Sequence, residues 1–260
     1  MNAKVNLALL NTTRFDSGAL GMLAMVIHQF SEPGRYRGSV LRAGTTFGDL
    51  EIMVDEKSDV MQLDIDLAAI AKQPRPDAQT GQDCNCHPES SGPPRVVSPS
   101  GYVLFHASSG SGFSVNLSHV SGKSKFDSTE LEKGDLFACS LLEPAQYQGL
   151  NTRTKAQLEI AVVFPADVKE GVSARLKAAE SMNVKVQDGA FQPAKLNVIS
   201  TQGLVFQINE AARIVIEKKS GSGDKKQFVG PKARWQKFIP APAAATKTSA
   251  KANANAKAKA

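Results

Sequence analysis

Two heptapeptides that lie 111 residues apart share one pattern: Glu32-Pro33-Gly34-Arg35-Tyr36-Arg37-Gly38 and Glu143-Pro144-Ala145-Gln146-Tyr147-Gln148-Gly149. In each copy a proline turn precedes a tyrosine that begins a β-like run. Proline restricts φ in such a turn, and a tyrosine at a β-sandwich corner packs its ring inward while its hydroxyl reaches a backbone carbonyl. The repetition therefore predicts a mostly β protein with structural corners at Tyr36 and Tyr147.

Strands are predicted after the first corner, where apolar and polar residues alternate with a period of two. This alternation is typical of half-buried antiparallel strands. The alternating apolar residues are Leu50, Ile52 and Val54 in one run and Met61, Leu63, Ile65 and Leu67 in the next.

A β-hairpin is predicted from residues 101–107 and 113–119, which flank a Ser/Gly loop at residues 108–112. A symmetric loop would pair His106 with Ser114. The apolar residues of both runs then share one face, and this consistency favours the register.

The chain divides into two or three small antiparallel β-sandwich units of the Ig or cupredoxin-like type. Prolines and polar residues between the first two units predict a linker, and Val168, Val172, Leu176 and Ala179 recur at helical spacing. The expected boundaries are 1–70 (β-sandwich unit), 71–100 (Pro-rich linker), 101–165 (β-sandwich unit), 166–182 (one short helix as a connector), 183–238 (β unit) and 239–260 (disordered Ala/Lys tail).

The third unit carries a family resemblance. It contains a strand, then Phe191-Gln192-Pro193-Ala194-Lys195-Leu196-Asn197-Val198, then a second apolar run that ends at Asn209. In this pattern, residues 183–216 resemble the opening strands of cupredoxin-like β-sandwich domains, which implies that fold. The copper ligands are not implied, because Glu210-Ala211-Ala212-Arg213 stands where a histidine is expected and no His or Met follows Met182.

The sharpest chemical feature is the cluster formed by Cys84, Cys86 and His87. Two thiolates and an imidazole within four residues could hold copper(I) or supply three ligands of a zinc site. The Cys-x-Cys spacing is unusual for zinc, and no second cluster supplies a further ligand. Exposed linker thiols without a metal are the alternative, so the expected cofactor is none, with copper or zinc as the other reading.

For three further groups, a histidine, a cysteine and a pair of aspartates, a structural role is the simpler interpretation. His119 ends an apolar strand face, so we expect a hydrogen-bonded histidine there, and Cys139 between two apolar residues is expected to pack as a small hydrophobe. Asp64 and Asp66 share one strand face. They could act as an acid–base pair or bind calcium, but a solvated outer face is the simpler interpretation.

The net charge of +6 is unevenly distributed. From Glu217 to the end, eleven Lys or Arg residues stand against two acidic ones, which makes this segment +9 and residues 1–216 −3. Spaced lysines suit a polyanion such as nucleic acid or an acidic surface, and a purely solubilising end is the alternative. The candidate polyanion-binding residues are Lys247, Lys251, Lys257 and Lys259.

No run of 18 apolar residues is present, and the apolar stretch near residue 19 lacks the features of a signal peptide. Together with few cysteines, this predicts a cytoplasmic protein without a membrane span. The leading functional hypothesis is a non-enzymatic binding or assembly module that engages a protein partner or its own copies as an oligomer. A soft-metal-handling protein is the alternative, and an enzyme whose site is not visible in the sequence is a third.

Overall fold

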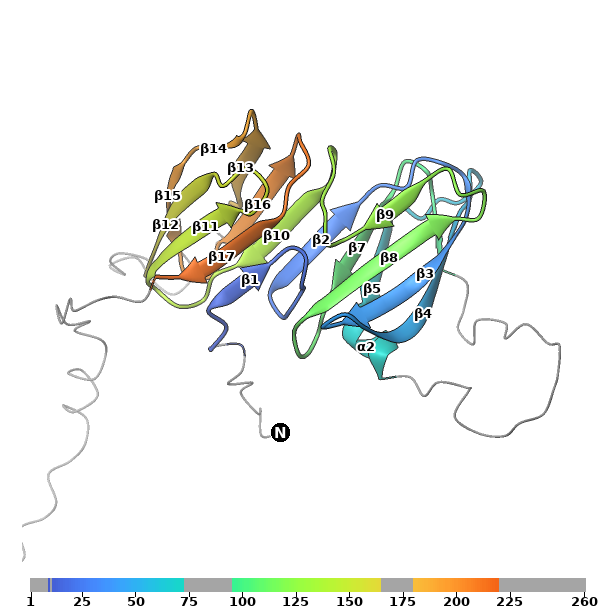
Figure 1. Ribbon diagram of the computed structural model, residues 1–260, viewed down its shortest axis with the longest axis horizontal. Coiled ribbons are helices and arrows are strands. Elements are labelled where there is room, and N and C mark those ends of the chain that lie inside the picture. Colours follow the sequence, from blue (N-terminus) through green and yellow to red (C-terminus); the bar gives the residue numbers. More distant parts are fainter. Residues whose placement is uncertain (1–8, 10, 73–94, 165–179, 220–260) are drawn as a thin grey trace, which may run out of the picture. The chain divides into compact units, whose positions relative to one another are not determined.

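The alternating pattern determines which side chains become buried. In β8 (Phe113–His119), Phe113, Val115 and Leu117 are buried while Asn116 and Ser118 are exposed. The computed structural model describes residues 9, 11–72, 95–164 and 180–219, and these residues confirm a mostly β protein with three sheets and one helix, α2 (Leu67–Ala71) (Figure 1). None of the described residues forms a helix long and apolar enough to cross a membrane.

The strands are arranged in one seven-stranded sheet, here called the long sheet, and two five-stranded sheets, called short sheet 1 and short sheet 2. The long sheet has the order β14 (Ala190–Gln192), β13 (Met182–Gln187), β16 (Gly203–Ile208), β10 (Leu136–Ser140), β2 (Ala24–His28), β7 (Tyr102–His106) and β5 (Gln62–Asp66). Short sheet 1 has the order β6 (Arg95–Val97), β4 (Thr45–Val54), β3 (Gly34–Arg42), β8 and β9 (Lys125–Asp127). Short sheet 2 has the order β15 (Lys195–Ile199), β12 (Gln157–Val163), β11 (Gln146–Asn151), β17 (Ile214–Lys218) and β1 (Arg14–Asp16).

The two short sheets have the same topology. In each, three antiparallel strands (β4-β3-β8 or β12-β11-β17) are flanked by one parallel strand (β6 or β15) and one short antiparallel strand (β9 or β1). The two halves of the long sheet also match, since β5 and β7 pair in parallel as β13 and β16 do. The described chain therefore consists of two repeats, and β14 has no counterpart in the first.

The sequence offset of 111 also relates residues well before the two tyrosines. It matches Phe15-Asp16-Ser17 of β1 with Phe126-Asp127-Ser128 of β9, and Leu20 with Leu131. Repeat 1 therefore begins at β1 and ends with β8, at residue 119, while repeat 2 runs from β9 to β17. Each opening strand pairs with the last strand of the other repeat, because β1 lies on β17 and β9 lies on β8.

A local two-fold relation joins the repeats in the long sheet. β2 and β10 are equivalent strands that pair with each other in antiparallel orientation, and Val26 lies opposite Phe137, its own equivalent at offset 111. An antiparallel pair of equivalent strands places a two-fold axis between them. The long sheet thus runs continuously from one repeat into the other (Figure 1).

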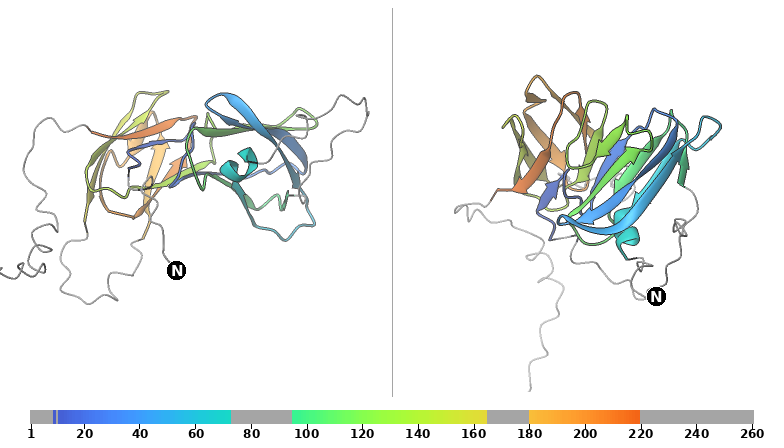
Figure 2. Two further views of the ribbon diagram at one scale, coloured as in Figure 1. Left: turned by 90° about the horizontal axis from the view of Figure 1, so that it is seen from below. Right: turned by 45° about the vertical axis from the view of Figure 1, so that its right-hand side comes forward.

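One part of the core lies between the long sheet and short sheet 1, where β9 of repeat 2 adds to the strands of repeat 1. Phe105 of β7 stacks on Phe126 of β9 with ring centroids 5.2 Å apart, and Phe30 lies 4.6 Å from Tyr36. All four rings are buried, and the two layers can be followed in Figure 2. Such contacts between strands of different sheets are how two amphipathic sheets bury their apolar faces.

The predicted hairpin of residues 101–119 does not exist. β7 pairs with β2 and β5 in the long sheet, whereas β8 pairs with β3 and β9 in short sheet 1. The residues predicted to face inward are nevertheless buried, including Val103 and Phe105. Alternation fixes the buried face of a strand, but it does not say whether the next strand is a hydrogen-bonded neighbour or lies in the facing sheet.

Hydrogen bonds also cross the expected unit boundaries. β5, from the segment 1–70, pairs with β7, from the segment 101–165. From the segment 183–238, β15 pairs with β12, β16 pairs with β10, and β17 pairs with β11 and β1. The segment 71–100, expected to be a linker, contains β6. The apolar run at residues 61–67 is predicted to be a strand throughout, but its last residue, Leu67, begins α2, and Asp66 is the N-cap of this helix. The helix expected over 166–182 lies outside the described residues as far as residue 179, and its last residue, Met182, begins β13. The expected tail at 239–260 lies wholly outside the described residues.

Candidate functional site at the junction of the repeats

The described site with the most organised polar contacts is the pairing of β1 with β17, which we call the clasp. Phe15 provides its buried anchor, with 2% of its surface exposed. Ser17 lies fully buried beside it: its Oγ accepts a hydrogen bond from the backbone N–H of Ile214 at 3.0 Å, and its own N–H donates to the Ile214 carbonyl at 2.9 Å. The clasp thereby joins the first described strand to the last one.

The other junction, between β9 of repeat 2 and β8 of repeat 1, contains the same arrangement. Ser128 Oγ accepts from the N–H of Val115 at 2.8 Å, and the Ser128 N–H donates to the Val115 carbonyl at 2.9 Å. Both serines follow an aspartate that bends the chain, since Asp16 accepts from the N–H of Gly18 and Asp127 from that of Thr129, each at 2.9 Å. A buried serine at this position satisfies a backbone donor that would otherwise lack a partner.

An ionic network distinguishes the clasp from its counterpart. Asp16, 6% exposed, accepts two bonds from the Arg213 guanidinium, at 3.2 Å from Nε and 3.1 Å from Nη2. The bonds with Asp16 raise the pKa of Arg213 above its ordinary value. Arg14 lies 3.3 Å from the Asp16 carboxylate and also pairs with Glu217. Two arginines therefore share one buried carboxylate at the clasp.

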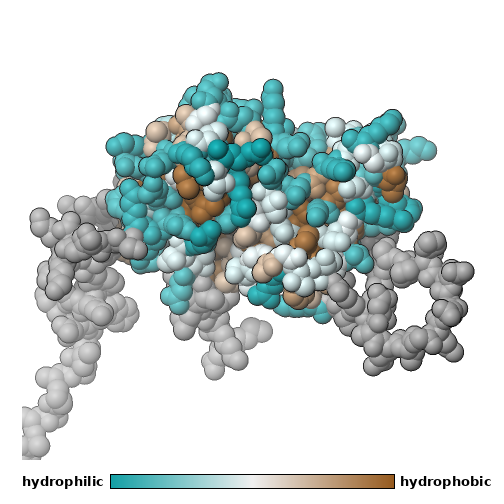
Figure 3. Space-filling view, viewed as in Figure 1, coloured by the Kyte–Doolittle hydropathy of each residue, from teal (hydrophilic) through white to brown (hydrophobic). Residues whose placement is uncertain are grey.

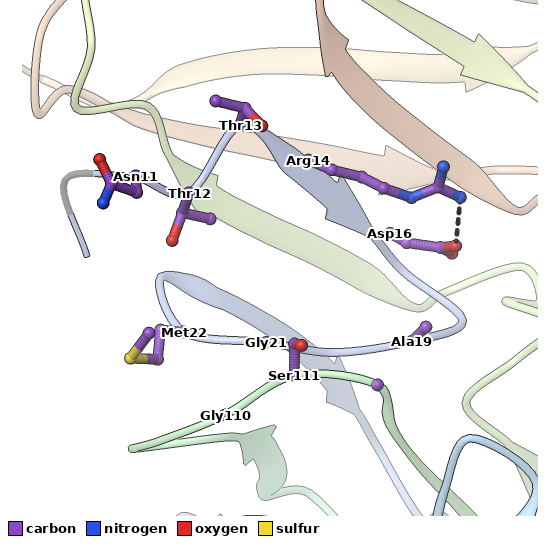
Figure 4. A pocket seen from close by; sticks show the side chains of 11 residues that line it. Asn11, Thr12, Thr13, Arg14, Asp16, Ala19, Gly21, Met22, Gly110 and Ser111 are labelled. Carbon is purple, nitrogen blue, oxygen red and sulfur yellow. Dashed lines mark hydrogen bonds and ion pairs between the residues drawn. The ribbon is translucent and has the colours of Figure 1, made fainter. Parts of the chain in front are cut away.

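A pocket of about 550 Å³ borders the clasp. Residues from the segment 11–22 line one side, and Gly110, Ser111 and Gly112 of the loop between β7 and β8 line the other (Figure 4). Arg14 and Asp16 point toward each other at its edge. The pocket therefore lies beside the segment that connects β1 in short sheet 2 to β2 in the long sheet.

A second polar contact joins the repeats inside the long sheet. His28 Nδ1, at the end of β2, lies 2.6 Å from Oδ1 of Asp135, which is 2% exposed and also accepts from the Glu132 N–H at 2.7 Å. The His28 ring packs against Phe30 and Phe126 with centroids 4.4 and 4.3 Å away. The sequence contains no signal for this pair, because the two residues are 107 positions apart.

The structure places both predicted corner tyrosines in the core. The Tyr36 hydroxyl donates to the Glu32 carbonyl at 3.2 Å, and the Tyr147 hydroxyl donates to the Glu143 carbonyl at 3.0 Å. Their rings are 1% and 0% exposed. Each hydroxyl thus closes a loop of four residues at the point where the chain passes from the long sheet to a short sheet.

We expect the stability of the protein to fall at alkaline pH through Tyr147. Burial, and then the charge of Glu143, raise the pKa of Tyr147 from 10.0 to about 12. The folded state therefore keeps this proton at a pH where the unfolded state loses it, so the free energy of unfolding decreases as the pH rises from about 10 to about 12. Urea unfolding at pH 9 and pH 11 should show a smaller decrease for Tyr147→Phe than for the wild type.

The control for this measurement is Tyr102→Phe, because Tyr102 is 44% exposed. It should keep the pH dependence of the wild type. An unchanged decrease in Tyr147→Phe would show that other groups cause the alkaline loss.

The hydrogen bonds and exposure of His119, Asp66 and Asp64 are those of residues with a structural role or a solvent-exposed position. His119 is 9% exposed, with Nδ1 2.6 Å from Ser121 Oγ and Nε2 3.3 Å from the Pro33 carbonyl. Burial acts to raise the pKa of Asp66, but hydrogen bonds donated by Ser108 and Ala68 outweigh it and lower that pKa. Asp64 is exposed. The described residues contain no group of three or more His, Cys, Asp or Glu suited to a metal ion.

Cys139 of β10 is expected to be unreactive in the folded protein. It is 4% exposed, and burial raises its pKa from 9.0 to about 12. Because the thiolate is the reactive form, its labelling by Ellman's reagent at pH 8 should be on the order of 1000-fold slower than that of an unfolded thiol. The measurement uses the variant Cys84→Ser/Cys86→Ser, in which Cys139 is the remaining cysteine. Rapid labelling of Cys139 before urea is added would contradict this prediction.

Several predicted site residues lie outside the described part of the chain. These are the soft-metal candidates Cys84, Cys86 and His87 and the polyanion-binding candidates Lys247, Lys251, Lys257 and Lys259. Copper or zinc binding and polyanion binding stay predictions. Comparison of the chain with protein-family models, with curated proteins and with solved structures finds no match.

Proposed function

We propose that this protein is a non-enzymatic binding and assembly module built from two β-sandwich units of the Ig or cupredoxin-like type, which engages protein partners or its own copies. The observation that carries the proposal is the reciprocal placement of β1 and β9. Each opening strand completes a sheet whose other strands belong to the other repeat. A contact of this kind joins separable units, and the same pairing can join units from different chains.

The strand edges support the same proposal. Among the described residues, each sheet ends in a strand that pairs on one side only: β5 and β14 in the long sheet, β6 and β9 in short sheet 1, and β1 and β15 in short sheet 2. Unpaired backbone N–H and C=O groups on such strands can pair with an added strand. Beside the β15 edge, Val163 and Ile199 lie opposite each other and are 49% and 36% exposed.

Apolar side chains are also exposed elsewhere on the surface. Met61 and Tyr102, at neighbouring positions of the long sheet, are 53% and 44% exposed, and the Tyr102 N–H donates to the Met61 carbonyl. Figure 3 shows apolar residues exposed among hydrophilic ones on one face of the molecule. Contiguous exposed apolar areas bordered by polar residues mark protein contact surfaces, and we propose the adjacent side chains of Met61 and Tyr102 as part of such an area.

The proposal is tested by light scattering over a range of concentrations together with a pull-down from the native host. A mass above that of one chain, or a partner retained at a fixed ratio, is expected. A protein that is monomeric at all concentrations and retains no partner would contradict the proposal.

A further inference from the structure

We propose that two copies of this chain exchange whole repeats, so that repeat 1 of each copy packs against repeat 2 of the other. The inference rests on the proposed function and specifies its partner, a second copy of the same chain. The exchange opens the turn at residues 120–124, between β8 and β9, and leaves each repeat otherwise intact.

The contacts between the repeats are of a kind that a second copy can reproduce. β1 pairs with β17, β2 with β10 and β8 with β9, and His28 bonds to Asp135 across the same boundary. All of these contacts are non-covalent. Only the segment 120–124 links the two repeats along the chain, so opening it frees them to form the same contacts in a dimer.

The two-fold relation makes the exchanged dimer closed. Each repeat offers one opening strand and accepts the opening strand of the other repeat, and Val26 faces its equivalent Phe137 at the centre. Two chains that exchange repeats therefore form two junctions and leave no repeat without a partner. Each junction would contain the strand pairs that one chain forms alone.

Opening the turn at residues 120–124 breaks few contacts. Val120 is 61% exposed, and a side chain at Gly122, where φ is +75°, would meet nothing within 4 Å. The bonds within the turn are the Gly122 N–H to the His119 carbonyl at 2.8 Å, the Lys123 N–H to Ser121 Oγ at 3.4 Å and the contacts of Ser121 with the His119 ring. The Val120 N–H also donates to the Arg35 carbonyl at 2.9 Å, and the Tyr36 hydroxyl lies 3.5 Å from Ser124 Oγ. The bond from the His119 N–H to the Ser124 carbonyl belongs to the β8–β9 pairing and can re-form between chains.

Two equivalent cysteine pairs can locate these strands in solution. The first is Arg14→Cys/Glu217→Cys across β1 and β17, and the second is Ser118→Cys/Lys125→Cys across β9 and β8. Arg14 and Lys125 are related by the offset of 111, and both members of each pair are directly opposite and exposed. Neighbouring antiparallel strands lie at a separation that a disulfide can span.

Both pairs are placed in Cys84→Ser/Cys86→Ser and oxidised after size separation, and the products are compared on non-reducing gels. In the dimer fraction, both pairs are expected to link two chains covalently. In the monomer fraction, both pairs are expected to close within one chain.

The other outcomes overturn the inference in distinguishable ways. Internal disulfides in both pairs of the dimer fraction would reject exchange but leave assembly through another surface, and so the proposed function, in place. Linked chains for the first pair alone would mean that only β1 exchanges. A protein without any dimer fraction would overturn the inference whatever other partner it binds.

A deletion of residues 121–123 provides a second test. It leaves one residue between the paired His119 and Ser124, which is too short for a hairpin. β9 can then pair only with β8 of another copy, so the ratio of dimer to monomer should rise at least about tenfold. A folded deletion variant that stays monomeric would overturn the inference, and the cysteine pairs decide the matter if this variant does not fold.

Discussion

Replacing Phe126 by alanine is expected to lower the free energy of unfolding by about 3–5 kcal/mol. Phe126 belongs to β9 and is 4% exposed, and its ring packs on Phe105, Phe30 and His28 with centroids 5.2, 5.7 and 4.3 Å away. The substitution removes a ring that joins short sheet 1 to the long sheet, and the surrounding rings cannot close the cavity without moving. Urea unfolding followed by circular dichroism measures the change.

The control for Phe126→Ala is Val120→Ala. Val120 lies in the neighbouring turn and is 61% exposed, so its truncation should change the free energy of unfolding by no more than about 0.5 kcal/mol. A loss below about 1.5 kcal/mol in Phe126→Ala, half the lower bound expected for such a truncation, would show that β9 contributes little to the core.

The second large effect is expected for Asp16→Ala, at about 2–4 kcal/mol. The change removes a buried carboxylate that accepts hydrogen bonds from Arg213 and from the Gly18 N–H, and it leaves Arg213 without its nearest negative charge. Since β1 is held to repeat 2 by this network and by Phe15, the variant should also expose the N-terminal segment to proteolysis. Thermal unfolding and limited trypsin digestion measure the two effects.

The internal repeat supplies a matched control in Asp127→Ala. Asp127 occupies the equivalent position but is exposed, and its carboxylate accepts hydrogen bonds from the backbone N–H and the hydroxyl of Thr129. Its replacement should cost about 1 kcal/mol or less. Equal losses in the two variants would mean that the ionic network of the clasp adds no stability.

The repetition at offset 111 was the most informative signal in the chain. It indicated the β class and the two positions at which tyrosines lie in the core. The same offset could also have identified the clasp, because Phe15-Asp16-Ser17 and Phe126-Asp127-Ser128 are in register with the tyrosines. That match is short and lies in the poorly patterned first thirty residues, where it is readily overlooked.

The polar partners of the site could not be predicted in the same way. Arg213 reaches Asp16 from 197 positions away, and Asp135 reaches His28 from 107. No local pattern specifies such a pair, since each residue alone is compatible with an exposed position. Their proximity is a consequence of which strands become neighbours.

The sequence by itself determined which side is buried in the strands whose apolar residues alternate, such as β4 and β8, because a period of two places these residues on one face whichever strand lies beside it. Only the tertiary structure decided the pairing. β7 and β8 have the inward faces that a hairpin would require, yet they lie in different sheets, and β1 lies on β17 instead of on a strand of its own repeat. The physical reason is that backbone hydrogen bonds are alike at every residue, so neighbour choice depends on how all apolar faces are covered together.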